Sequence, residues 1–349
     1  MLALLLSLAM HAPSGEGNPP AYKLEVREAR RIEAVQTFDI RTYTMSAAEW
    51  VLVVARAPEL PCQIHMSTRL EPAGATSSEQ SPLHRPILTA RVPARGSARE
   101  KGLTVHVTYR GTLQSRRLVP LTPDEPAPAV PPLAADERRI FAAASRTIDF
   151  RSKIFQTWLD ENGLRPSGGE RDIDFARRAF LAVKNGFRYQ WPPDHDGKAS
   201  SVCRAGRGDC ASLCVVFVAA LRASGVPARA LVGHWARSLR PDHRNGEAPE
   251  THVKAEFFAE GIGWVPVDPT AAQNDRSPAG LSFFGNDPGD FLVQHVDYDL
   301  LVNTIHFGQQ PVRHLQGIAR WAFGAGSWDG LDARENWKVR TLAIAQAGR

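Results

Sequence analysis

A chain of 349 residues is long enough for two domains, and its 43% apolar and 23% charged content lies near globular averages, which argues against disorder or a fibrous repeat. The net charge of +5 arises between residues 21 and 120, which hold 15 Lys and Arg against 9 Asp and Glu. Because these basic residues are dispersed and accompany no zinc finger or RNA-binding signature, nucleic-acid binding is not expected.

The chain begins with the apolar run MLALLLSLAM, which is too short to span a bilayer and about as long as the hydrophobic part of a secretory signal. We therefore expect residues 1–20 to be a signal segment and the protein to be periplasmic or secreted. No basic residue precedes the run, so the alternative is a misread N-terminus and a cytoplasmic protein. No later stretch reaches about 18 apolar residues, and no integral membrane segment is expected.

Short alternating runs fill residues 21–119. Segments such as EWVLVVAR (49–56) and LTVHVTYRG (103–111) place β-branched and aromatic residues with a period of two. This pattern predicts an antiparallel β-sandwich domain. The composition then changes at 120–135, where six prolines favour a semi-rigid linker over a helix or a central strand.

The chain after this linker shows helical periodicity first and strand-like runs afterwards. Helices are predicted at 136–164, 172–185 and 208–224, and strands at 228–236, 251–258 and 264–268. Helices that are segregated from strands favour an α+β domain over 136–300. The last residues, 301–349, are interpreted as a C-terminal extension of that domain.

Cys210 lies at the start of the helix predicted at 208–224. The preceding segment RAGRGD supplies two glycines for a tight entry and Asp209, a residue type that often starts helices. A thiol attacks carbonyl carbons as its thiolate, and a helix N-terminus favours negative charge. The backbone N–H of Cys210 could also bind a developing oxyanion. These features indicate a nucleophile.

The chain holds four cysteines, too few for a disulfide-built scaffold. Cys214 lies one helical turn after Cys210 among apolar residues and is predicted to lie in the core. Cys203 is either buried or forms a disulfide that shields Cys210. A zinc site of Cys203, Cys210 and Cys214 is the competing arrangement, although their spacing lacks the CxxC pairs typical of zinc.

A histidine and an aspartate follow on consecutive predicted strands. In THVKAEFF, a period of two places His252 and Lys254 on one polar face. A hairpin centred on Glu260 would set His252 directly opposite Asp268, with Cβ atoms about 4.5–5.5 Å apart. The carboxylate could then hydrogen-bond the imidazole and orient it as the base for Cys210.

The blocks GRGDCASLCVVFVAALRASGVPARALVG, THVKAEFF and GWVPVDPT follow one another in this order. They resemble the three motif blocks of the transglutaminase-like superfamily, and the resemblance covers about residues 172–270. It implies a papain-like α+β fold with a triad of Cys210, His252 and Asp268. The β-rich region before it is similar in architecture to the sandwich that often precedes this domain.

Two features of the family pattern are specific to individual positions. The side chain that stabilises the transition state in the family is matched by position alone to Tyr189 or Trp191. Many family members carry an aromatic residue two positions after the histidine, where this chain has Lys254. That difference bears on substrate preference.

The triad implies thiol-dependent acyl transfer or hydrolysis on protein or peptide amides. An amine acceptor would make the enzyme a cross-linking acyltransferase, and water would make it a cysteine protease or amidase. No cofactor and no metal are expected. Two other classes stay open: a non-catalytic binding module that recognises a cell-wall or extracellular protein partner, and a structural zinc protein.

Overall fold

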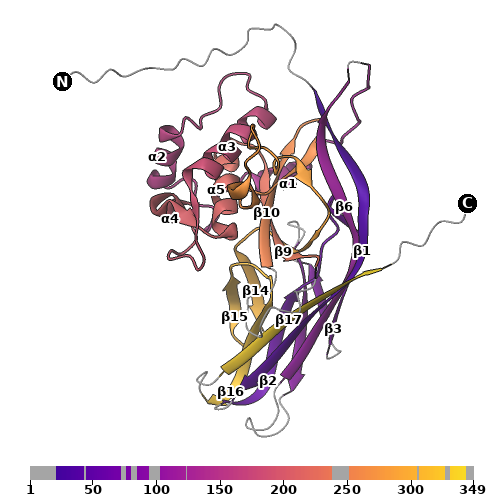
Figure 1. Cartoon of the computed structure of the whole chain (residues 1–349). Coiled ribbons are helices and arrows are strands. Elements are labelled where there is room, and N and C mark those ends of the chain that lie inside the picture. The colour runs from indigo at the N-terminus through magenta and orange to yellow at the C-terminus, as the bar shows by residue number, and fades with distance from the viewer. Residues whose placement is uncertain are drawn as a thin grey trace, which may run out of the picture.

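The computed structural model describes residues 21–42, 45–71, 76–79, 85–93, 103–122, 124–237, 251–304, 306–326 and 331–342. The expected signal segment, residues 1–20, lies outside this part of the chain. A β-sandwich occupies one end of the molecule, and helices packed on a second antiparallel sheet occupy the other (Figure 1). Two long strands, β1 (Tyr22–Thr42) and β6 (Leu103–Pro120), run along both parts.

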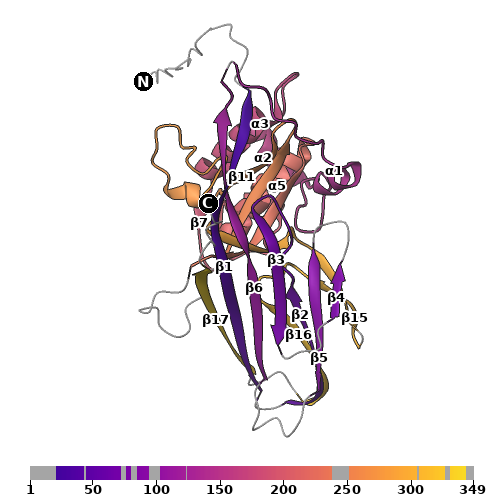
Figure 2. The same ribbon diagram turned by 90° about the vertical axis from the view of Figure 1, so that its right-hand side faces the viewer.

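The sandwich consists of two antiparallel sheets, as the alternating runs predicted. In the first sheet β1 lies between β6 and β17 (Leu331–Leu342), and β3 (Gln63–Glu71) pairs with β6 (Figure 2). The second sheet has the order β16 (Ile318–Gly326), β2 (Met45–Ala55), β5 (Pro86–Pro93) and β4 (Thr76–Glu79). Alternate apolar side chains form the core between them, among them Ile32, Leu52, Val107 and Trp337.

The C-terminal strands belong to these two sheets. Residues 301–349 were interpreted as an extension of the helical domain, but β17 pairs with β1 and β16 pairs with β2. The segment therefore leaves the α+β part and returns to the sandwich, where the Trp337 side chain is fully buried. Its alternating polar and apolar residues suit a strand with one covered face.

The helical layer contains α1 (Ala135–Phe141), α2 (Lys153–Glu161), α3 (Asp172–Gly186), α4 (Ala199–Ala205) and α5 (Cys210–Ala223). The predictions for α3 and α5 are confirmed. Every residue of α5 from Ala211 to Arg222 is buried, as expected of a helix that is apolar on all sides. Among the described residues, no helix has the length and apolarity needed to cross a membrane.

The single helix predicted at 136–164 is wrong, because it divides into α1 and α2. Between them, Asp299 accepts hydrogen bonds from the Ser145 hydroxyl at 2.6 Å and from the Thr147 hydroxyl at 2.8 Å. Ser152 then caps α2 through the backbone N–H of Phe155. Short polar side chains that bond outside the helix favour turns over helix continuation.

The helices pack on a separate antiparallel sheet outside the sandwich, with the order β11 (Gly263–Val267), β10 (Thr251–Ala259), β9 (Ala228–Trp235) and β13 (Phe291–Val296). Helix α5 packs on β9 and β10. The buried side chain of Gln63 joins the sandwich to this sheet, bonding both the N–H and the C=O of Val293 at 2.8 and 2.9 Å. A hairpin of β14 (Leu300–Thr304) and β15 (Gly308–Val312) follows. The remaining short elements are β7 (Arg188–Tyr189), β8 (Arg207–Gly208), η1 (Ala271–Asn274) and β12 (Asn286–Asp287). The predicted α+β class is confirmed.

Candidate active site

Cys210 is the first residue of α5, and its position depends on the turn before it. Asp209 is the N-cap, and its Oδ1 accepts the backbone N–H of Ser212 at 2.9 Å and the Ser212 hydroxyl at 2.6 Å. A Cβ at Gly208 would lie 2.4 Å from the Ser212 Cβ, so only glycine lets the chain approach the helix this closely. These contacts fix the helix start and leave Cys210 partly exposed at its first turn.

Cys214 ties α5 to the strand that carries the histidine. Its thiol is fully buried and donates to the Val253 carbonyl at 3.2 Å, as the core prediction required. Val253 is the neighbour of His252 on β10. The start of the helix and the histidine are therefore held by the same packed interface.

The structure brings His252 and Asp268 together. Nε2 of His252 lies 2.8 Å from Oδ2 of Asp268, and both residues are buried. Oδ1 of Asp268 accepts the backbone N–H groups of Thr270 at 3.2 Å and Ala271 at 2.9 Å. A carboxylate held by three donors has a fixed orientation, and it fixes the imidazole in turn.

The predicted hairpin register is wrong by one position at its centre. Glu256 pairs with Pro266, so the ladder is centred on Gly261 and not on Glu260. Gly261 has a φ of +72°, a conformation that glycine adopts readily in the tight loop after Ala259. The shift moves each pairing by two residues, so every side chain keeps its face of the sheet. His252 therefore stays on the expected face and reaches Asp268 diagonally.

Charge distribution around His252 favours the imidazolium. Burial disfavours the charged ring, but the charge and hydrogen bond of Asp268, aided by a hydrogen bond with Cys210, outweigh it and raise the pKa of His252 to about 9. Since Nε2 faces Asp268, the other ring nitrogen is left for the sulfur of Cys210. Burial also disfavours the Asp268 carboxylate, yet His252 and Lys254 hold the pKa of Asp268 below its usual value.

Trp235 is a site residue that the sequence did not reveal. Its ring stacks on the His252 imidazole at 4.7 Å between centroids, with an angle of 21° between the planes. Phe291 meets the same imidazole edge-on at 6.0 Å. Trp235 ends β9, which connects to β10 through a segment whose length fixes no register. Only the observed pairing of His234 with Thr251 brings the two rings together.

Tyr189 lies close to Cys210, and Trp191 follows it two residues later on an exposed part of the chain. The parallel pairing of β7 with β8 sets Tyr189 beside Gly208, two residues before the cysteine. Burial and the nearby Cys210 and Asp209 raise the pKa of Tyr189. The side chains of Tyr189 and Trp191 are 52% and 63% exposed. Their predicted roles in substrate binding or transition-state stabilisation stay predictions.

The polar face of β10 is buried beneath the sandwich. Lys254 and Glu256 share the face of His252, and each is at most 5% exposed. Arg116 of β6 pairs with Glu256 at 2.7 Å and with Asp287 at 3.2 Å. Lys254, which stands where the family pattern has an aromatic residue, thus points into a buried layer of charged side chains.

None of the four cysteines forms a disulfide: Cys62, Cys203, Cys210 and Cys214 are all free thiols. Within the described part of the chain, no group of three or more His, Cys, Asp or Glu residues is suited to hold a metal ion. The disulfide considered for Cys203 is therefore wrong for this structure, and the three-cysteine zinc arrangement is not formed.

Comparison with known proteins identifies the region that carries this site. A family model of the transglutaminase-like superfamily matches residues 165–269. A curated relative, an uncharacterized protein of Haemophilus influenzae, is 33% identical over an alignment of 89 positions that covers 21% of this chain and 24% of that protein. This chain therefore matches about a quarter of the relative's length.

Solved structures extend the comparison beyond this region. A candidate cysteine protease from Cytophaga hutchinsonii superposes with a TM-score of 0.55 at 15% identity, over 92% of this chain and 93% of that one. The likeness covers both the sandwich and the helical part, and it concerns the fold. The periplasmic domain of TgpA from Pseudomonas aeruginosa aligns over 70% of this chain and 88% of its own, at 16% identity and a TM-score of 0.35.

Proposed function

We propose that the transglutaminase-like domain at residues 165–269 catalyses thiol-dependent acyl transfer from protein or peptide amides. Cys210 is the nucleophile, His252 the base and acid, and Asp268 the group that orients the histidine. The observation that carries the proposal is the 2.8 Å contact between His252 and Asp268 beside a cysteine at a helix N-terminus. A nucleophile, a base within its reach and a third group that holds the base are the parts that this chemistry needs.

The first half of the reaction forms a thioester. His252 is an imidazolium at neutral pH because its pKa is raised to about 9, and a cation beside the sulfur favours the thiolate. The Cys210 sulfur attacks the amide carbonyl carbon, and the C=O double bond opens to an oxyanion. When the double bond re-forms, the C–N bond breaks and His252 gives its proton to the leaving amine.

The second half returns the enzyme to its starting state. An acceptor, either a primary amine or water, attacks the thioester carbon while His252 takes its proton. The C–S bond then breaks, and the sulfur leaves as thiolate beside the re-formed imidazolium. An amine acceptor yields a new amide cross-link, and water yields a carboxylic acid by deamidation or peptide hydrolysis. Exclusion of water from the thioester decides between the two.

Two donors are available for the oxyanion. The backbone N–H of Cys210 lies in the first turn of α5, where amide groups lack helical partners. The Tyr189 hydroxyl is the second candidate, and its raised pKa keeps it protonated and able to donate. Trp191, which is 63% exposed, offers an apolar surface to the substrate side chain.

The proposed location is the periplasm or the cell exterior, on the support of the apolar run at residues 1–10. In that setting the natural substrate would be an extracellular or cell-wall-associated protein.

The test is the intact mass of the protein after incubation with a glutamine-containing peptide library, with and without a primary amine. Wild type is expected to show a thioester adduct, and Cys210→Ala is expected to show none. Cys203→Ala is the matched control, because it removes another partly exposed thiol outside the site. Amine-dependent products would identify a transferase and amine-independent ones a hydrolase. Identical behaviour of wild type and Cys210→Ala would overturn the proposal.

A further inference from the structure

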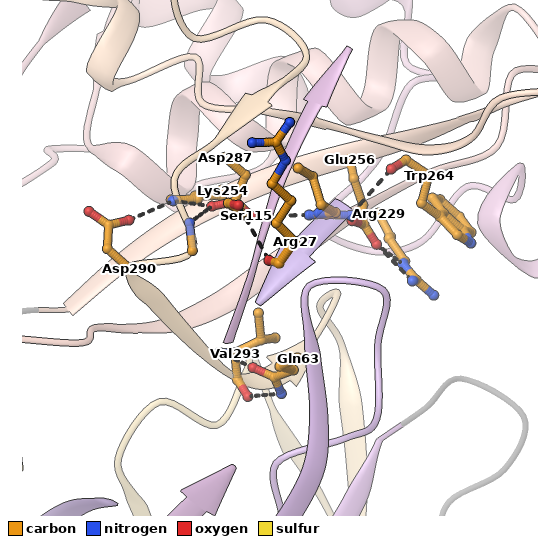
Figure 3. Close-up of polar contacts among 12 residues, drawn as sticks. Arg27, Gln63, Ser115, Arg229, Lys254, Glu256, Trp264, Asp287, Asp290 and Val293 are labelled. Carbon is orange, nitrogen blue, oxygen red and sulfur yellow. Dashed lines mark hydrogen bonds and ion pairs between the residues drawn. The ribbon is translucent and has the colours of Figure 1, made fainter. Parts of the chain in front are cut away.

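Lys254 is a buried cation on β10. Its side chain is 6% exposed, and its Nζ lies 3.3 Å from Asp287 and 3.6 Å from Asp290 (Figure 3). The same ammonium lies over the Trp235 ring, 4.7 Å from its centroid. Trp235 in turn stacks on His252. A buried ammonium is tolerated only when such partners replace its water.

Lys254 also faces the proposed triad. The β10–β11 ladder pairs Ala255 with Val267, so its continuation by one residue sets Lys254 opposite Asp268. His252 lies on the same face one step further along β10. Asp268 is thus flanked by two cations, and the two positive charges both favour its ionised form. Burial opposes the ammonium of Lys254, but Asp287, Asp268 and Asp290 keep its pKa above the usual value.

The sandwich holds this cation from behind. Asp287 bonds Lys254 through Oδ1 and Arg116 through Oδ2, at 3.3 and 3.2 Å. Arg116 belongs to β6, is fully buried, and donates to Glu256 at 2.7 Å and to the Trp264 carbonyl at 3.2 Å. A continuous chain of ionic contacts therefore leads from a sandwich strand to the residue opposite Asp268.

We propose that Lys254 is a positioning residue that favours the ionised form of Asp268 from across the ladder and so supports its contact with His252, and that Arg116 and Asp287 anchor Lys254 to the sandwich. This inference rests on the proposed function, because it assigns a role within the same triad. It makes the sandwich a part of the catalytic machinery. Trp235 of β9 supplies an aromatic face to His252, and its ring also packs against the Lys254 ammonium.

Several charged or titratable groups surround this pair, and each packed element contributes. Strand β10 contributes His252 and Glu256, β9 contributes Arg229, and β6 contributes Arg116. The segment around β12 contributes Asp287 and Asp290, and α5 contributes Cys210 and Cys214. Arg116 and Arg229 are both occupied by Glu256, at 2.7 Å each. Lys254 is therefore the cation that this layer presents to Asp268.

The test uses iodoacetamide alkylation of Cys210, followed by peptide mass spectrometry from about pH 4 to pH 9, and it needs no substrate. Lys254→Met is expected to raise the acid-side midpoint of the reaction by about one pH unit or more, the shift expected when a nearby opposite charge is removed. Lys254→Arg keeps the charge and is expected to restore the wild-type midpoint. Asp290→Asn removes a competing carboxylate and is expected to move the midpoint to lower pH.

A double-mutant cycle shows whether Lys254 acts through Asp268. In the Asp268→Asn background, Lys254→Met and Asp290→Asn are both expected to leave the midpoint where it is. The proposal is overturned if Lys254→Met keeps the wild-type midpoint, if Lys254→Arg shifts it as far as Lys254→Met, or if the shift persists without Asp268. If Lys254→Met does not fold, Asp290→Asn is the test. Its midpoint should move to lower pH in the wild-type background and should not move in the Asp268→Asn background. A move to higher pH in Asp290→Asn overturns the proposal.

Failure of the triad itself gives a different result. If wild-type Cys210 reacts like Cys210 of His252→Gln at every pH, no activated thiol exists, and both the proposed function and this inference are overturned. If wild type differs from His252→Gln but Lys254→Met matches wild type, only the role of Lys254 is overturned.

Discussion

The two faces of strand β10 are both buried, but one is apolar and the other is charged. Val253, Ala255 and Phe257 face α5 and join the apolar core of the helical layer. His252, Lys254 and Glu256 face the sandwich and are buried with ionic partners. An apolar face stabilises the fold by burial alone, whereas a buried charged face is stable only if each group is paired. The difference indicates that the first face sets stability and the second sets chemistry.

The largest effect is expected from the proposed nucleophile, Cys210. Cys210→Ala should reduce acyl transfer by at least about 1,000-fold, because no other group can form the thioester. Its free energy of unfolding should stay within about 1 kcal/mol of wild type, since the side chain is small and partly exposed. Product assays by mass spectrometry and urea denaturation measure the two quantities. Substantial activity in Cys210→Ala would contradict the assignment.

The apolar face should respond in the opposite way. Phe257 is fully buried, with its ring 6.4 Å from that of Phe217 and 5.8 Å from that of Phe284. Phe257→Ala should lower the free energy of unfolding by about 3–5 kcal/mol while leaving the pH midpoint of Cys210 alkylation unchanged in the folded protein. Phe323→Ala is a control, because that ring is 48% exposed. A shifted midpoint in Phe257→Ala would break the division between the two faces.

The charged face should make stability depend on pH. His252 has a folded pKa of about 9, above the usual 6.5, so its pairing stabilises the protein fully below about pH 6.5 and is lost as the pH rises through 9. The free energy of unfolding should fall by an amount on the order of 3 kcal/mol over that range. Urea denaturation of wild type and His252→Gln at both ends of the range isolates this contribution. Equal pH slopes in the two proteins would refute it.

The smallest effect is expected where an aromatic ring supports the charged face. Trp235→Leu removes the ring stacked on His252, an interaction worth about 0.5–1.5 kcal/mol, and should slow acyl transfer by roughly 3- to 10-fold. Trp158→Leu is the matched control, since Trp158 packs between Phe155 and Phe187 in the helical layer. Steady-state rates under saturating substrate measure both. An equal loss in the two variants would indicate a general packing effect.

Local patterns in the sequence were enough to predict most helices and strands of the α+β part. The helices α3 and α5 and the strands β9 to β11 appear where period and capping residues placed them. The break between α1 and α2 was not predictable, because it depends on Asp299, a residue far along the chain that bonds Ser145 and Thr147. The pairing of β16 and β17 with the first strands is likewise a long-range choice.

The candidate site was predictable as a set of residues but not as an environment. Motif order and the alternation of side chains along the strands identified Cys210, His252 and Asp268 as candidates. The error in the hairpin centre left His252 and Asp268 on the same face. Sequence alone could not show that Lys254 is buried, because a polar residue on an alternating strand ordinarily faces solvent. Recognition of that burial requires the sandwich strand that carries Arg116.

The most direct test of the central claim is the alkylation rate of Cys210 by iodoacetamide at pH 6.5 in wild type and in His252→Gln. If an imidazolium held by Asp268 maintains the thiolate, wild-type Cys210 should react at least about 10-fold faster than the same thiol without His252. Equal rates in the two folded proteins would contradict the account, because the cysteine would then behave as an ordinary thiol at a helix terminus.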